Sequence, residues 1–239
     1  MNNDVDLGSD PWGKDNGENR EMTRDSSAPA KSERMAYSRG QLAAKRLLDF
    51  GLAAILFVLV SPFWLIAVIW IRLDSPGPAI FKQERIGRLG RPFTIYKFRT
   101  MVRNAEELTK QRLKEVEDIE NFVFQEENDP RITDSGRFLR KTSLDELPQL
   151  INILGGSMSL VGPRPEVPEI VRRYTPEQRE RLNVLPGVTG LAQVNGRSEL
   201  PLGETMRYDL EYVRNWSVWL DIKILYQTIF VVFSGKGAF

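Results

Sequence analysis

Residues 50–71 contain no charged side chain, and this run of 22 residues (FGLAAILFVLVSPFWLIAVIWI) limits what the chain can fold into more than any other feature. A straight helix of that length rises about 33 Å, close to the roughly 30 Å thickness of a bilayer core. The run therefore predicts a membrane helix, and a single crossing of the bilayer is its simplest form.

Two features of this run favour a helix that enters and leaves by the same face. Ser61 and Pro62 lie at its midpoint, where proline removes a backbone hydrogen bond and the serine hydroxyl can bond the freed carbonyl. Both flanks are basic, with five bases against one acid in residues 26–46 and eight against two in residues 72–103. Basic flanks favour the cytoplasmic side. These residues leave the re-entrant helix and the single crossing as equal alternatives.

The composition excludes several classes of site. None of the 239 residues is cysteine or histidine, which rules out disulfides, zinc–thiolate sites, cysteine nucleophiles, histidine bases and histidine-ligated metals. Acid–base or nucleophilic chemistry is left to carboxylates, lysine, tyrosine and hydroxyl groups. The 33 basic and 32 acidic residues nearly cancel, so the net charge of +1 does not indicate a partner.

The chain divides into three parts by composition. We expect residues 1–40 to be a disordered polar tail, because they lack apolar periodicity. Residues 41–74 hold the membrane helix, and residues 75–239 form a small compact domain of mostly helical α/β (α+β) class. Within that domain, residues 79–86 and 93–100 flank a glycine-rich turn and predict a β-hairpin.

Shorter patterns complete the domain. We expect a charged helix over 103–118, a loop over 121–130, helices that begin at Thr133, Ser143 and Thr175, a strand over 157–161, a turn over 185–190 and a helix over 203–215. The apolar segment 218–233 is interrupted by two charged residues. Trp216 and Trp219 at its start suit an amphipathic helix at a membrane interface, and a core helix is an equal alternative.

Residues 140–149 (RKTSLDELPQ) hold the strongest candidates for chemistry. Ser143 and Glu146 have the spacing of a capping box, so one interpretation of the acids is a helix cap. The other is functional, because the helix N-terminus would keep Asp145 ionised as a nucleophile or metal ligand. Adjacent helical residues point about 100° apart, which predicts different roles for Asp145 and Glu146. Arg140 is placed to bind an anion.

Further basic residues occur in turns and on the hairpin. Arg164 lies between two prolines, Arg197 follows Asn-Gly, and Lys97 and Arg99 share one face of a strand. Arginine suits bidentate binding of phosphate, although each residue alone is equally consistent with a solvated surface position. Together with a carboxylate beside a membrane segment, they predict a doubly phosphorylated substrate and a lipid partner.

Several long motifs, in order and in register, resemble the bacterial sugar transferase family, the monotopic phosphoglycosyl transferases, and within it the undecaprenyl-phosphate hexose-1-phosphate transferases. They are KFRTM (97–101), RKTSLDELPQ (140–149), SLVGPRPE (159–166), PGVTGLAQVNGR (186–197) and YVRNWSVWLD (212–221). The resemblance covers residues 45–239.

The resemblance implies transfer of a sugar-1-phosphate from a UDP-sugar to undecaprenyl phosphate, giving UMP and starting exopolysaccharide, capsule or O-antigen synthesis. It implies that Asp145 is the nucleophile, forms a covalent aspartyl phosphosugar and contacts Mg²⁺, with Glu146 as its partner. Arg140, Arg164 and Arg197 match the family's active-site arginines. The break at residues 61–62 matches a re-entrant helix, which implies a monotopic protein on the cytoplasmic face of the bacterial inner membrane.

Other expectations follow from the same comparison of motifs. Larger relatives carry further transmembrane helices before the catalytic region, where this chain has the polar tail. The closing GKGAF resembles hexose-1-phosphate transferases and favours glucose or galactose phosphate. The expected partners are a UDP-sugar, undecaprenyl phosphate and membrane lipid, without nucleic acid, and a homo-oligomer is left open. Two alternatives are a glycosyltransferase that releases UDP and a non-enzymatic membrane scaffold of a polysaccharide assembly complex.

Overall fold

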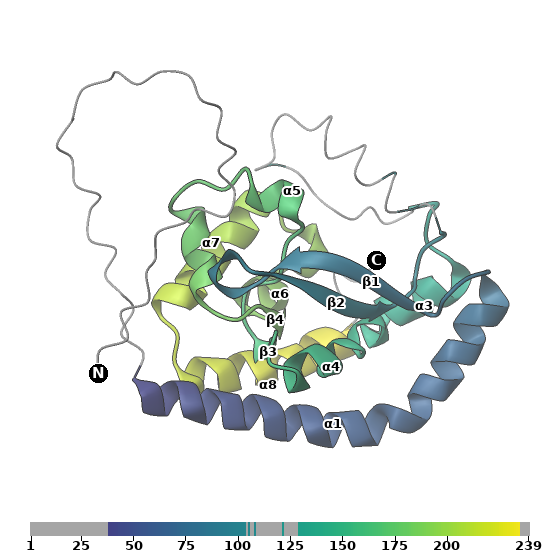
Figure 1. Ribbon diagram of the computed structural model, residues 1–239, viewed down its shortest axis with the longest axis horizontal. Coiled ribbons are helices and arrows are strands. Elements are labelled where there is room, and N and C mark those ends of the chain that lie inside the picture. The colour runs from purple at the N-terminus through teal and green to yellow at the C-terminus, as the bar shows by residue number, and fades with distance from the viewer. Residues whose placement is uncertain (1–37, 104, 106–107, 109–120, 122–128, 235–239) are drawn as a thin grey trace. The chain divides into compact units, whose positions relative to one another are not determined.

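The computed structural model describes residues 38–103, 105, 108, 121 and 129–234 (Figure 1). The predicted tail over 1–40, the helix over 103–118, the loop over 121–130 and the closing residues 235–239 lie wholly or mostly outside them. The proposed boundaries between the three parts therefore stay predictions. The described chain is mostly helical with two small sheets, as the α+β prediction requires.

The apolar run lies within one helix, α1 (Arg39–Asp74), which begins with a capping box between Ser38 and Gln41. The helix continues through Pro62 and curves along one side of the domain (Figure 1). Ser61 Oγ donates a hydrogen bond of 2.8 Å to the carbonyl of Val58, the group to which residue 62 would otherwise donate. The predicted role of this serine is confirmed. Of the described helices, α1 is long and apolar enough to cross a membrane.

The N-terminal half of α1 is bound to the domain by polar side chains. Lys45 Nζ donates to the Val161 carbonyl and to Asp221 Oδ2, at 3.0 and 2.7 Å. Asp49 Oδ1 accepts from Ser159 Oγ and from the Leu160 N–H. These contacts lie about one turn apart on one face of α1, and they fix that face against β3 (Ser159–Val161) and α8 (Val218–Ser234).

The C-terminal end of α1 is bound to the same domain. Asp74 accepts from the Ser135 N–H and Oγ, at 3.0 and 2.7 Å, at the start of α3 (Asp134–Lys141). Arg99 donates to the carbonyls of Ile71 and Ser75, so its guanidinium caps the last turn of α1. Both ends of the long apolar helix therefore contact one folded unit.

The predicted hairpin is confirmed. Strands β1 (Ile80–Ile86) and β2 (Pro92–Phe98) pair antiparallel, with Ile80 opposite Phe98, and a 3-10 turn (Arg88–Gly90) joins them. One apolar cluster packs the base of the hairpin against α1 and α3: Ala67, Ile71, Ala79, Phe98 and Leu139. The hairpin is thus rigidly attached to the C-terminal half of α1.

The second sheet corrects one prediction. Residues 185–190 were expected to form a turn, but β4 (Gly187–Thr189) pairs parallel with β3. The backbones approach so closely that a Cβ at Gly187 would lie 2.1 Å from the Gly162 nitrogen. The glycines that suggest a turn are needed here because no side chain fits between the two segments.

The described helices between β2 and the C-terminal part of the chain are short, and α7 (Leu202–Arg214) is the first long one after them. In addition to α3, the short helices include α4 (Gln149–Leu154), α5 (Pro168–Val171), η3 (Gln178–Asn183), α6 (Leu191–Asn195) and η4 (Arg197–Glu199). Thr133 caps α3 and α7 matches its prediction within one residue at each end, so both are confirmed. Thr175 and Gln178 form the predicted reciprocal cap bonds, but the helix after them is 3-10 rather than α.

Helix α8 has features of both a core helix and an amphipathic helix at a membrane interface, the two alternatives predicted for it. Asp221 and Ile224 are buried, and the buried Trp216 donates its indole N–H to Asp221. A separate set of large apolar side chains on α8 is exposed: Trp219, Ile222, Tyr226, Ile229, Phe230 and Phe233. One face of the helix therefore belongs to the core and another presents apolar surface.

We predict that Asp221→Ala lowers the free energy of unfolding by about 3–5 kcal/mol, because the largely buried Lys45 ammonium would lose the carboxylate to which it donates. The Tyr212 hydroxyl and the Trp216 indole would lose an acceptor as well. Glu177→Ala is the matched control, since its pair with Arg214 is exposed and should contribute only about 0–1 kcal/mol. Denaturant unfolding in detergent measures the free energy of unfolding of both variants. Equal decreases would contradict the prediction that the buried Asp221 contributes more to stability than the exposed Glu177.

Candidate active site

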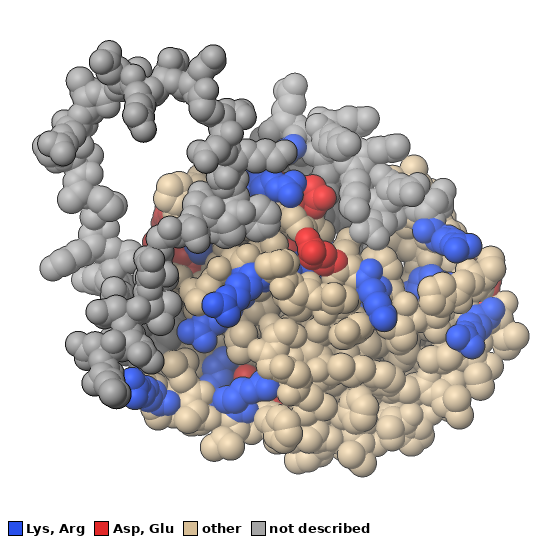
Figure 2. All heavy atoms as spheres, viewed as in Figure 1, with Lys and Arg blue, Asp and Glu red and all other residues tan. Residues whose placement is uncertain are grey.

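A cavity of about 970 Å³ collects most of the candidate residues. Its charged lining includes Lys97, Arg140, Asp145, Glu146, Arg164 and Arg197. Its apolar lining comes from α1, α4, β3, the β4 region and α8: Leu56, Leu150, Leu160, Val188, Leu225, Val231 and Val232. Figure 2 shows charged side chains gathered mainly above a broad uncharged area of the surface. The cavity therefore has the mixed lining that a ligand with a charged head and an apolar tail requires.

The segment that carries the two acids differs from its prediction. A helix was expected from Ser143, but Ser143 is left-handed (φ 58°) and caps nothing. Asp145 and Glu146 lie in a 3-10 turn, η2 (Leu144–Glu146), and α4 begins only at Gln149. The capping-box prediction is wrong because both of its side chains have distant partners: Arg197 donates to Ser143 Oγ, and Glu146 binds two cations.

Glu146 joins three separate segments. Its Oε1 accepts from Lys97 Nζ on β2 and from Arg164 Nη1, both at 2.9 Å. Burial alone would raise the pKa of Glu146, but Lys97 and Arg164 hold that pKa far below its usual range. Glu146 is therefore a permanently ionised anchor that holds two cations at the cavity.

Asp145, its neighbour, is in the opposite situation. Among the described residues, no group donates a hydrogen bond to its carboxylate. Burial raises the pKa of Asp145, and the adjacent Glu146 adds to this, while Lys97, Arg140 and Arg164 oppose it. A half-buried carboxylate beside three cations, with its oxygens uncommitted, is suited to act as a nucleophile or metal ligand. The contacts of the two acids differ, and their different roles stay a prediction.

The predicted basic residues all line the cavity, but their side chains have different partners. Arg140 Nε donates to Thr100 Oγ1 at 2.9 Å, and it lowers the pKa of Asp145. Arg197 is close enough to both acids for them to affect its own pKa, which burial lowers. Arg99 differs, because its guanidinium is occupied at the end of α1. Its expected role in substrate binding stays a prediction.

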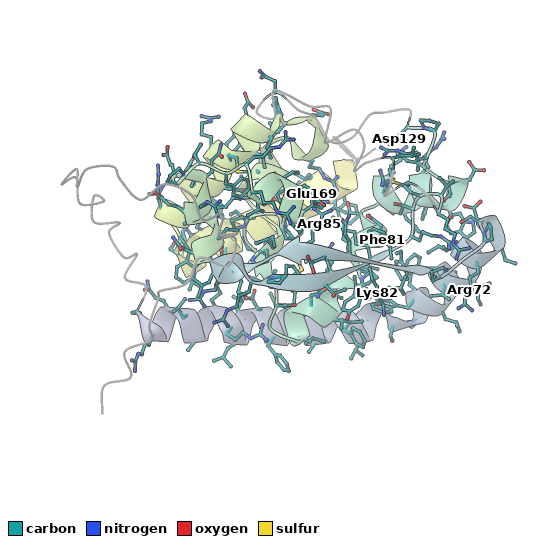
Figure 3. All side chains as sticks on the ribbon, turned by 45° about the horizontal axis from the view of Figure 1, so that its top comes forward. Arg72, Phe81, Lys82, Arg85, Asp129 and Glu169 are labelled. Carbon is teal, nitrogen blue, oxygen red and sulfur yellow. The ribbon has the colours of Figure 1, made fainter. Side chains whose placement is uncertain are left out.

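The loop that carries Arg164 is held by two arginines that the sequence analysis did not identify. Arg85, on the hairpin strand β1 (Figure 3), donates Nη1 to the Pro165 carbonyl at 2.9 Å. Arg181 donates Nη2 to the Arg164 carbonyl at 2.8 Å, and it forms a fully buried ion pair with Asp209. No local pattern marks Arg181, because only the folded chain brings residues 164, 181 and 209 together.

The donor set fits Mg²⁺ in a limited way. No group of three or more acidic side chains that could hold a metal occurs in the part of the chain that the structure describes. Mg²⁺ commonly uses one or two protein carboxylates and completes its shell with phosphate oxygens and water. The free oxygens of Asp145 can supply such a ligand, whereas Glu146 is occupied by cations.

Comparison with known proteins places this site in a family. The model of the family described as "Bacterial sugar transferase" matches residues 40–235, and these include every residue of the site. The chain belongs to the bacterial sugar transferase family. The family resemblance stated from the sequence is thereby confirmed.

Relatives of this bacterial sugar transferase have names that include sugars and a lipid phosphate. Galactosyl transferase CpsE of Streptococcus agalactiae serotype III is 44% identical over 203 residues, covering 84% of this chain and 45% of CpsE. Undecaprenyl-phosphate galactose phosphotransferase of Salmonella typhimurium is 43% identical, covering 82% and 41%. UDP-glucose:undecaprenyl-phosphate glucose-1-phosphate transferase of Escherichia coli K12 is also 43% identical, covering 82% and 41%. The chain spans less than half the length of these relatives.

The contrast between the two acids predicts opposite effects on stability. Glu146→Gln should lower the free energy of unfolding by about 1–3 kcal/mol, because Lys97 and Arg164 lose a charged acceptor. Asp145→Asn should leave the free energy of unfolding unchanged or raise it, because it removes a half-buried charge that makes no hydrogen bond with the described residues. Thermal unfolding in detergent without donor or Mg²⁺ compares them. A larger loss in Asp145→Asn would contradict these assignments.

Proposed function

We propose that this protein is a phosphoglycosyl transferase that moves a sugar-1-phosphate from a UDP-sugar to undecaprenyl phosphate and releases UMP. The observation that carries the proposal is the uncommitted carboxylate of Asp145 among Lys97, Arg140 and Arg164 in a cavity with an apolar lining. The names of the Salmonella and E. coli relatives support the lipid phosphate and the sugar-phosphate group.

Two displacements at one phosphorus account for the reaction. An oxygen of Asp145 attacks the phosphorus that bears the sugar, and the bond to the bridging oxygen breaks, so that UMP leaves with the electron pair. A phosphate oxygen of undecaprenyl phosphate then attacks the same phosphorus and the aspartyl oxygen leaves. Neither step needs a proton from the protein, which is consistent with a chain that lacks histidine.

The cations have separate tasks in this scheme. Arg140, Arg164 and Arg197 bind phosphate oxygens and stabilise charge as it moves to the leaving group. Glu146 keeps Lys97 and Arg164 in place before substrate arrives. Asp145, together with diphosphate oxygens, would hold Mg²⁺, which neutralises charge on the diphosphate when bound.

The proposed topology is a re-entrant, monotopic anchor on the cytoplasmic face of the inner membrane. Its support is that both ends of α1 bind one domain, at Asp49 and at Asp74, so the helix would have to leave that domain to cross a bilayer. Exposed apolar side chains of α1 and α8 provide a surface that membrane lipid can cover. The apolar lining of the cavity suits the polyprenyl chain.

The reaction class is tested by which nucleotide is released. The protein in nanodiscs is given Mg²⁺, undecaprenyl phosphate and one UDP-sugar at a time, starting with UDP-glucose and UDP-galactose. We expect UMP with one of these sugars and at least a 10³-fold loss of rate in Asp145→Asn, as for other catalytic nucleophiles. Release of UDP would instead establish transfer of the sugar alone.

The scaffold alternative makes a different prediction for the same variants. If the acids only shape a turn, Asp145→Asn and Arg164→Gln would leave polysaccharide synthesis in cells intact. We expect both to abolish it while the proteins remain folded and membrane-bound. Normal synthesis in Asp145→Asn would support the scaffold and discard the transferase.

Topology is tested by cysteine labelling, which is simple here because the chain has no cysteine of its own. Arg39→Cys and Arg179→Cys place single thiols at exposed positions before and after the apolar run. An impermeant reagent added to intact cells should label neither, and both should react after permeabilisation. Labelling of Arg39→Cys alone in intact cells would establish a single crossing.

A further inference from the structure

Gln193, on α6, has a side chain whose polar atoms are unused. Both its Oε1 and its Nε2 are buried, and neither has a hydrogen-bond partner among the described residues. The same residue lines the cavity that holds Asp145 and Glu146. A buried amide without partners is costly, and folded proteins seldom retain one without a ligand, a water molecule or a functional reason.

The position of Gln193 connects it with the arginines of the site. A Cβ placed on Gly190 would lie 2.3 Å from the Gly162 carbonyl oxygen and 2.7 Å from Gln193 Oε1, so these two oxygens flank the same glycine. Gly162 begins the turn that carries Arg164. Along the chain, Gln193 precedes Arg197 by four residues, but α6 ends between them at Asn195 and Arg197 is left-handed (φ 52°). The Arg197 guanidinium binds Ser143. The amide thus lies beside the turn that carries Arg164, and Gln193, Arg164 and Arg197 line the same cavity.

We propose that the Gln193 amide recognises the UDP-sugar next to the diphosphate, by donating one hydrogen bond to it and accepting another. This inference rests on the proposed function, because Arg164 and Arg197 are taken there to bind the diphosphate. A primary amide presents N–H and C=O side by side, so it matches a group that offers both. In a UDP-sugar, three groups do so: neighbouring hydroxyls of the transferred sugar, the two hydroxyls of the ribose and the imide edge of the uracil base.

The consequence for selectivity follows from the burial of the amide. A donor that lacks the matching group would leave the amide unpaired in the complex, and sites of this kind discriminate strongly against such analogues. A donor that has the group satisfies both atoms at once. Gln193 is therefore assigned to recognition of the donor, and the displacement steps remain with Asp145.

The test uses the full chain in nanodiscs and the near-isosteric variant Gln193→Met. Gln149→Met is the matched control, because the Gln149 side-chain nitrogen is also buried and unpartnered but this residue is not part of the cavity lining. Each protein is assayed with the preferred UDP-sugar, with its monodeoxy analogues at the transferred sugar and at the ribose, and with the N3-methyluracil analogue. Melting temperatures are measured in parallel.

We expect kcat/KM for the preferred donor to fall about 10- to 100-fold in Gln193→Met, mainly through KM, and to change less than 3-fold in Gln149→Met. The melting temperature of Gln193→Met should stay the same or rise, since the substitution removes an unsatisfied buried amide. A merely structural glutamine would instead lower it.

The analogues identify the group that is read. If wild type discriminates against one monodeoxy analogue and Gln193→Met does not, the amide binds the hydroxyl that this analogue lacks, on the transferred sugar or on the ribose. The same pattern with N3-methyluracil assigns the amide to the base. Unchanged kcat/KM and selectivity in Gln193→Met would overturn the inference and leave the proposed function standing. If wild type releases no UMP from any donor, the proposed function itself fails, and the inference fails with it.

Discussion

One carboxylate oxygen holds the site together. Glu146 Oε1 accepts from Lys97 on the hairpin and from Arg164 on the loop after β3, so three segments far apart in the sequence converge on one atom. Because Glu146 takes up these two cations, Asp145 next to it keeps both of its oxygens uncommitted among the described residues. The two adjacent acids therefore differ in chemistry because the fold pairs Glu146 with the cations and leaves the Asp145 carboxylate without a hydrogen bond from the described residues.

The anchor in turn depends on how its partners are held. The hairpin that carries Lys97 packs on the C-terminal half of α1 through Phe98, and Arg181 and Arg85 fix the backbone of the loop that carries Arg164. Polar contacts at both ends of α1 join the same helix to β3, α8 and α3. The apolar helix is therefore part of the scaffold of the site as well as the candidate membrane anchor.

The elements that the sequence predicted correctly are those that form through interactions between residues close in the chain. The hairpin, the Thr133 cap, helix α7 and the bond from Ser61 to Val58 all depend on residues close in sequence. The failures share the opposite cause. Ser143 caps nothing because Arg197, 54 residues away, donates to it, and residues 187–189 form a strand because β3 is alongside. The contacts of Arg99 at the end of α1 and the place of Arg181 under the Arg164 loop could not be predicted for the same reason, since their partners are set by tertiary structure.

The central claim is that Asp145 is the nucleophile, and the most direct measurement looks for the bond that it would form. The protein is incubated with Mg²⁺ and its UDP-sugar in the absence of undecaprenyl phosphate, then analysed by mass spectrometry of the intact chain and its peptides. We expect a mass increase of one sugar phosphate, located on Asp145 and lost on addition of undecaprenyl phosphate. Turnover to the lipid product with no modified protein at any time, or with the adduct on another residue, would contradict it.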